Sequence, residues 1–185
     1  MKRFRILLVN CTDGTEPSEV TLLSEFFRMM MLRYPKSVQF SQVDVRNKRD
    51  FMNQLILTWP NIIHISAHGT SHKFSSGRRG KNTSIFVGDE CITAEDISSL
   101  QEIPRKLVSV SACFSSYRDL ANSFLNLGAR HYLAPKTKVD WVEAAMFFVM
   151  FYKRYLYDKE PFEDSYDFAC EKTETKDFKE YWYSK

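Results

Sequence analysis

Short apolar runs recur along this chain, and polar, turn-forming segments separate them. Residues 4–9, 61–67 and 107–112 consist largely of Val, Ile, Leu and Ser, which is typical of buried strands in a parallel sheet. Residues 38–45 alternate apolar and polar positions, and residues 131–134 form a further short apolar run. The pattern therefore predicts five strands spread along the chain.

Longer segments between these runs have helical patterns. We expect a helix from the capping Ser18 to residue 32, a short one over residues 49–57, and one opening at Thr93. Further helices are predicted from Ser116 to residue 127, over the strongly apolar residues 142–156, and over residues 162–171, before a charged tail. Strands that alternate with helices predict one α/β domain over residues 1–185, a three-layer sandwich with helices on both faces of a mostly parallel central sheet.

A polar stretch over residues 70–84 interrupts this alternation. It has almost no core-forming side chains, so we predict an exposed, mobile loop. Its Arg78-Arg79 pair is a candidate processing site, although an ordinary solvated loop explains the composition equally simply. Residues 85–87 and 91–92 flank a Gly-Asp-Glu turn, which predicts a small hairpin.

Charge and cysteine content narrow the class of protein. The chain has 26 basic and 23 acidic residues, a net charge of +3, which is too mild to indicate a nucleic-acid partner. The apolar runs at residues 6–9 and 144–152 are too short for a signal peptide or a membrane span. The four cysteines are far apart and show no disulfide-type spacing, so we expect a soluble, cytoplasmic protein with reduced thiols.

Two reactive residues stand where predicted strands end. His68-Gly69 follows one buried run, and Cys113 follows another. Because the carboxyl ends of parallel strands meet at one edge of a sheet, we expect an imidazole base beside a thiol nucleophile. Gly69 allows a substrate to approach the backbone, so the backbone N–H groups of Gly69 and Cys113 are candidate oxyanion donors.

Plainer interpretations exist for each of these residues. Free cysteines and strand histidines are more often packing residues than catalytic ones. His64, His68 and His72 have a spacing of four, which would suit a metal on a helix, but the Ile-rich surroundings and Gly69 favour a strand. We therefore expect no metal and no cofactor, with His64 facing the interior.

Several motifs in order resemble the caspase-like peptidases, specifically their CHAT branch, over roughly residues 61–169. They are Ser66-Ala67-His68-Gly69, residues 91–97 (CITAEDI), residues 107–113 (LVSVSAC) with Ser115, residues 120–130, and the helix from Ala145 to Phe151-Tyr152. The resemblance implies a caspase-like fold, a Cys113 nucleophile, a His68 base and an oxyanion site near Gly69 and Cys113.

The nucleophile motif departs from better-known relatives. Caspases have Gln-Ala-Cys-x-Gly, whereas this chain has Ser111-Ala112-Cys113-Phe114-Ser115, so specificity for aspartate does not carry over. Metacaspases, which cut after Arg or Lys, have an acid where Ser111 stands. Ser111 and Asp140 are our candidates for lining a specificity pocket, with Asp140 supplying a charge.

We therefore predict a cysteine endopeptidase that cleaves a protein substrate through an acyl-enzyme. The resemblance suggests a bacterial defence or regulated-proteolysis pathway and a separate regulatory or sensor protein as partner, with no nucleic acid and no membrane. Two alternatives remain open: a catalytically silent caspase-like module that binds a partner, and an α/β domain that binds a small ligand.

Overall fold

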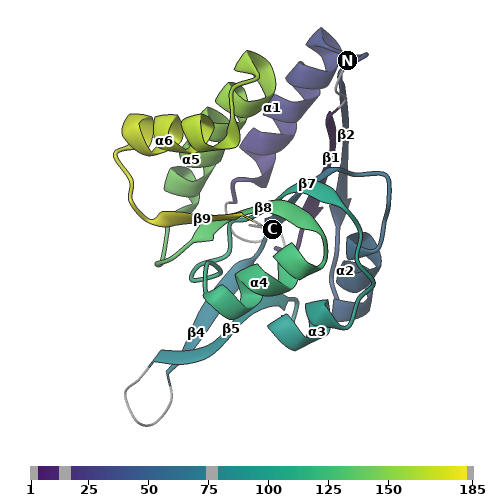
Figure 1. Ribbon diagram of the computed structural model, residues 1–185, viewed down its shortest axis with the longest axis vertical. Helices are drawn as coiled ribbons and strands as arrows, with labels where there is room; N and C mark the ends of the chain where they lie inside the picture. The colour runs from purple at the N-terminus through teal and green to yellow at the C-terminus, as the bar shows by residue number, and fades with distance from the viewer. Residues whose placement is uncertain (1–3, 13–17, 74–78, 183–185) are drawn as a thin grey trace.

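A mostly parallel six-stranded sheet forms the centre of the computed structural model, which describes residues 4–12, 18–73 and 79–182 (Figure 1). Its order is β2-β1-β3-β7-β8-β9. The first five are parallel: β2 (Val38–Asp44), β1 (Phe4–Asn10), β3 (Ile62–Ser66), β7 (Arg105–Val110) and β8 (Ala129–Pro135). β9 (Phe178–Trp182) pairs antiparallel with β8. The predicted α/β class and sheet direction are confirmed.

Helices cover both faces of this sheet (Figure 1). One layer contains α1 (Val20–Arg33), α5 (Trp141–Tyr152), the π-helical η1 (Lys153–Asp158) and α6 (Phe162–Thr173). The other contains α2 (Lys48–Leu55), α3 (Ala94–Ser98) and α4 (Arg118–Asn126). Alternate residues of β1 enter two separate cores, Ile6 and Leu8 on one face and Leu7 and Val9 on the other. Burial on both faces explains why such strands are continuous apolar runs.

Two segments differ from the prediction. Much of the expected loop at residues 70–84 is β-structure: β4 (His68–Lys73) pairs antiparallel with β5 (Arg79–Val87), which pairs with β6 (Glu90–Ile92). The predicted charged tail contains β9. A strand pairs through its backbone, so the polar residues of β4 and of the first half of β5 give no apolar signal. β9 is a short run, FKEYW, within a charged tail, and it places Phe178 in the core. Arg79 begins β5, whereas Arg78 lies outside the described residues, so the processing hypothesis remains a prediction.

The parallel strands end together at one edge of the sheet. Asn10 pairs with Ser66, and Ile65 pairs with Val110. The segments that follow β1, β3 and β7 therefore lie side by side, which places the predicted site residues at this edge. Among the helices of the described residues, none is long and apolar enough to span a bilayer.

Candidate functional site

His68 lies at the junction between the central sheet and the smaller sheet. β3 ends at Ser66, and β4 begins at His68 itself. The side chain is exposed, and its ring meets Trp141 edge to face, with 5.4 Å between the ring centroids. Trp141 is the first residue of α5. It was not among the predicted site residues, because only the fold brings the start of α5 beside His68.

Cys113 follows the end of β7 after Ser111 and Ala112, and its side chain is half-buried. Its Sγ atom lies 3.7 Å from the carbonyl oxygen of Val139, which precedes α5. The β8–α5 connection and the first residue of α5 therefore touch the two reactive side chains, the thiol through Val139 and the imidazole through Trp141.

Gly69 brings the two strand ends into contact. A Cβ atom placed on Gly69 would lie 2.2 Å from the carbonyl oxygen of Cys113 and 2.9 Å from its nitrogen. Both distances are far below van der Waals contact, so the backbone after His68 packs directly on the Cys113 peptide. This close approach, which only glycine permits, joins the His-Gly and Ala-Cys motifs in one site.

The turn after Cys113 has an unusual backbone. Phe114 has a φ of 61°, a left-handed conformation that is rare for a bulky side chain. Its N–H donates to the carbonyl oxygen of Thr137 at 3.1 Å, and the Ser116 N–H donates to that of Pro135 at 2.9 Å. These bonds hold the turn against the end of β8, and such strain often accompanies functional sites. A phenylalanine gives no sequence signal for it.

A buried polar network lies beneath this edge. The hydroxyl of Ser111 donates to Oε1 of Glu19, the residue that precedes α1, and His64 Nε2 lies 3.6 Å from the same oxygen. On its other side, His64 Nδ1 lies 3.0 Å from Ser109 Oγ and 3.1 Å from the Tyr152 hydroxyl. All five residues are buried, so the predicted inward orientation of His64 is confirmed. Because His64 is on β3 and both serines belong to the β7 segment, the network joins the two strands that lead to His68 and Cys113.

Glu19 is the charged centre of this network. Burial alone would raise the pKa of its carboxyl group, but the electrostatic interaction with His64 and the hydrogen bond from Ser111 outweigh that effect, so the pKa is lowered. The carboxylate is thus the preferred form although it is only 1 % exposed. Sequence reasoning placed a cap at Ser18 and missed Glu19, because its partners are far away in the chain.

Replacing Glu19 by glutamine should reduce the free energy of unfolding by about 3 kcal/mol at pH 7, because one partner of a buried charged network is lost. The pKa of the Glu19 carboxyl is lower in the folded protein than in the unfolded chain, where it is about 4.3. The stabilisation by the carboxylate is therefore complete at pH values above about 4.3, and it is lost as the pH falls through the pKa of the folded protein. Urea unfolding at pH 7 and at pH values below 4 should therefore show the two proteins converging in acid.

The matched control for Glu19 is Glu25→Gln on α1, an exposed carboxylate paired with Arg28 at 2.8 Å. We expect this variant to change stability by less than about 0.5 kcal/mol. Equal stability of the Glu19 and Glu25 variants at pH 7 would contradict the assigned role of Glu19.

The two candidate pocket residues have structural partners. Ser111 is buried, with its hydroxyl on Glu19. Asp140 is exposed and caps α5, accepting a 2.8 Å bond from the Val142 N–H within a capping box completed by Glu143. Asp140 is therefore accessible from solvent, whereas Ser111 is not.

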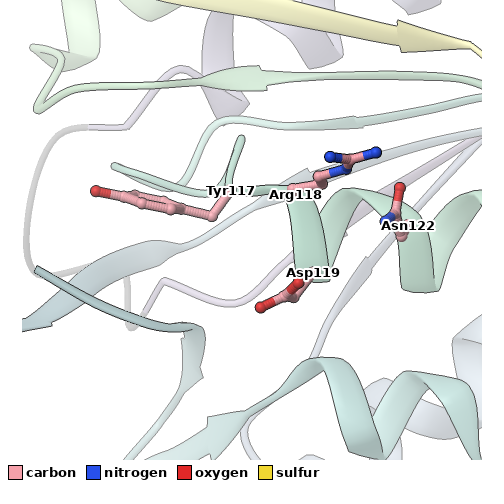
Figure 2. Close-up of a pocket in the computed structure, with 4 residues that line it drawn as sticks. All are labelled: Tyr117, Arg118, Asp119 and Asn122. Atoms are coloured by element: carbon pink, nitrogen blue, oxygen red, sulfur yellow. The ribbon is translucent and has the colours of Figure 1, made fainter.

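A hollow of about 500 Å³ opens at the start of α4, shortly after Cys113 in the chain. Figure 2 shows its four lining side chains, with Tyr117 extending away from the helix and Asp119 and Asn122 pointing to different sides of it. The full lining is Tyr117, Arg118, Asp119 and Asn122. The sequence predicted a helix start here at Ser116 but no hollow.

The other thiols have less suitable surroundings. Cys11 is buried, and burial raises its pKa strongly; burial also raises the pKa of the half-buried Cys170. Cys91 is half-buried on β6, and all four cysteines are unpaired thiols. Over the described residues, no group of three His, Cys, Asp or Glu side chains is placed to hold a metal ion.

Comparisons with known proteins identify the family to which this chain is similar. A family model described as "CHAT domain" matches residues 9–163. Two crystal structures of the Saccharomyces cerevisiae separase–securin complex match with TM-scores of 0.49 and 0.48 at 12% and 13% identity. The matches cover 83% and 86% of this chain but only 10% of the solved chain, so this chain spans about a tenth of its length. No curated protein matches.

Proposed function

This chain belongs to the CHAT domain family, and from that premise we propose that it is a cysteine endopeptidase in which Cys113 is the nucleophile and His68 the general base. The observation that carries the proposal is the contact of Gly69 with the Cys113 peptide. It supports a common site for the two motifs, since His68 directly precedes Gly69.

In the proposed first step, the Cys113 thiol gives its proton to the His68 imidazole, and the sulfur attacks the scissile carbonyl carbon. The carbonyl electron pair moves onto oxygen. Backbone N–H groups of Gly69 and Cys113 are the candidate donors to this oxyanion. The Trp141 ring lies edge to face against this imidazole.

In the second step, the tetrahedral intermediate collapses and the C–N bond breaks. His68 returns the proton to the leaving amine, and the acyl group remains on Cys113 as a thioester. Water then attacks the thioester while His68 accepts its proton. The C–S bond then breaks, the new carboxyl terminus leaves, and His68 returns the proton to the Cys113 thiolate, which regenerates the enzyme.

Substrate recognition is proposed to use the surfaces that border Cys113. Asp140 lies on the connection that touches the Cys113 sulfur, and it is the exposed candidate for the specificity pocket. Ser111, the other candidate, is buried with its hydroxyl on Glu19 and does not present it to a substrate. The hollow at Tyr117–Asn122 directly follows the nucleophile turn and would accommodate substrate residues on one side of the cut. A protein substrate and a separate regulatory protein are the partners we propose.

A sequence-diverse peptide library tests the function. Wild-type protein and a Cys113→Ser variant are incubated with the library, and products are identified by mass spectrometry. We expect wild type alone to release products sharing a sequence pattern around the cut. Absence of products, with both proteins folded, would instead support the catalytically silent module.

A further inference from the structure

The C-terminal strand β9 contacts the nucleophile turn (residues 113–116). The Tyr181 hydroxyl, on β9, donates a 2.5 Å hydrogen bond to the carbonyl oxygen of Ser116. Tyr181 pairs with Tyr132 on the neighbouring strand β8, and the Tyr132 hydroxyl donates to the carbonyl oxygen of Ser115 at 2.8 Å. Two tyrosines on paired strands therefore hold two successive carbonyl groups of this turn.

A second connection to the turn runs through Asp177, the residue directly before β9. Its carboxylate accepts a 2.8 Å hydrogen bond from the Thr137 hydroxyl, and its carbonyl oxygen accepts a 2.7 Å bond from the Lys136 N–H. The carbonyl oxygen of Thr137 is in turn the acceptor for the Phe114 N–H at 3.1 Å. Asp177 therefore fixes the segment to which the Phe114 backbone is bonded.

The strained backbone at Phe114 requires support of this kind. Its φ is 61°, and a positive φ at a bulky side chain persists only where the surrounding contacts over-determine it. Each of the three residues after Cys113 has a backbone group bonded to β8, to β9 or to the connection that follows β8. Gly69 packs on the Cys113 peptide itself, so the strands β8 and β9 supply the support beyond it.

Packing anchors β9 independently of these polar contacts. Phe178 is buried and stacks on Phe147 of α5, with 3.8 Å between the ring centroids and an interplanar angle of 2°. The Tyr166 hydroxyl, on α6, donates to the Phe178 carbonyl oxygen at 3.1 Å. Removal of the hydroxyl of Tyr181 should therefore leave β9 in place and change only its contact with the turn.

We propose that β9 positions the nucleophile turn, with Tyr181 and Asp177 as the positioning residues. Tyr181 acts through the Ser116 carbonyl group, and Asp177 acts through Thr137. The proposal rests on the proposed function, in which Cys113 is the nucleophile. The turn begins at Cys113, so a shift of the turn moves both its sulfur and its backbone N–H, and displacements of about 1 Å can lower a rate about 100-fold.

Tyr181→Phe tests the proposal, because it removes the hydroxyl and keeps the ring. We expect kcat for a peptide selected from the library to fall about tenfold, with KM within about twofold of wild type, since the turn orients the reacting group. Tyr166→Phe is the matched control: it also removes a hydroxyl bonded to a backbone carbonyl group, but one on β9 rather than on the turn. Its kcat should stay within about twofold of wild type. Equal kcat values for the two variants would overturn the proposal.

A pair of Thr137 variants tests the connection through Asp177. Thr137→Val removes the hydroxyl that donates to the Asp177 carboxylate, whereas Thr137→Ser retains it. We expect kcat to fall about tenfold in the valine variant and to stay within about twofold of wild type in the serine variant. Equal kcat values for these two variants would overturn the role of Asp177.

Hydrogen exchange provides a readout that does not depend on proteolysis. Amide exchange of wild type, Tyr181→Phe and Tyr166→Phe is followed by mass spectrometry of peptides that cover residues 112–119. We expect exchange there to be about fivefold faster in Tyr181→Phe, because the turn loses one hydrogen bond, and unchanged in Tyr166→Phe. Unchanged exchange in Tyr181→Phe would overturn the positioning role. A wild type that cleaves no peptide, with the exchange difference present, would contradict the proposed function and support the hold of β9 on the turn.

Discussion

Cys113→Ala is expected to lower the cleavage rate of a peptide selected from the library by about 10³-fold or more, and His68→Ala by a similar factor. The His68→Ala/Cys113→Ala double variant should cleave no more slowly than Cys113→Ala alone. The reason is that a nucleophile and its base act as a unit. Once one of the two side chains is absent, loss of the other cannot lower the cleavage rate further. Initial rates under identical conditions, followed by chromatography of the products, provide the measurement.

Cys91→Ala is the matched control, since Cys91 is also a half-buried thiol but lies on β6. Its rate should stay within about twofold of wild type, because substitutions away from a site usually have small effects. If the double variant lost activity by the product of the two single-variant factors, the two side chains would act separately, which would contradict the dyad.

Gly69→Ala should have the second-largest effect. The new Cβ would meet backbone atoms of Cys113 at 2.2 and 2.9 Å, so β4 or the Cys113 peptide must move. Overpacking of this kind costs about 1–3 kcal/mol of stability, and displacement of catalytic groups by about 1 Å can lower a rate about 100-fold. Urea unfolding and initial cleavage rates of the same preparation measure the two effects.

Gly88→Ala is the matched control for Gly69→Ala, and it distinguishes a loss of cleavage activity from a loss of stability. Gly88 has a φ of 58°, and a Cβ there would lie 2.6 Å from the Arg46 carbonyl oxygen, so this substitution is also strained. It lies in the β5–β6 turn, away from the Cys113 peptide. We expect a destabilised protein whose folded fraction cleaves at the wild-type rate. Equal activity losses in the two glycine variants would show that the Gly69 contact has no special importance.

The central fold could be predicted because its strongest signals are local. β1, β3 and β7 are apolar on both faces, and each has the length and composition of a buried strand. The small strand β8 and the capping box at Thr93 were likewise evident, and the structure confirms both. The hairpin of residues 85–87 and 91–92 is confirmed as the β5–β6 pair, but the pairing of β4 with β5 was not predicted because residues 70–84 are polar. β9 was not predicted because it is a short run within a charged tail, although its Phe178 is in the core.

The site was predictable only in part, because some of its residues are placed by local sequence signals and others by contacts between distant segments. His68, Gly69 and Cys113 follow strands whose parallel direction fixes where they meet. Glu19 and Trp141 depend on the way that α1 and α5 pack against the sheet edge, and Glu19 contacts Ser111 across 92 residues of sequence. No short-range sequence pattern indicates such a contact. It becomes evident only once the start of α1 is placed beside the end of β7.

Covalent labelling by a thiol-directed peptidyl electrophile, located by peptide mass spectrometry, tests the proposed dyad most directly. We expect one adduct, on Cys113, formed rapidly in wild type and much more slowly in His68→Ala. Cys11 should stay unmodified, because it is buried and its pKa is raised. A Cys113 that remains unmodified while Cys11 or Cys91 reacts would contradict the proposed dyad.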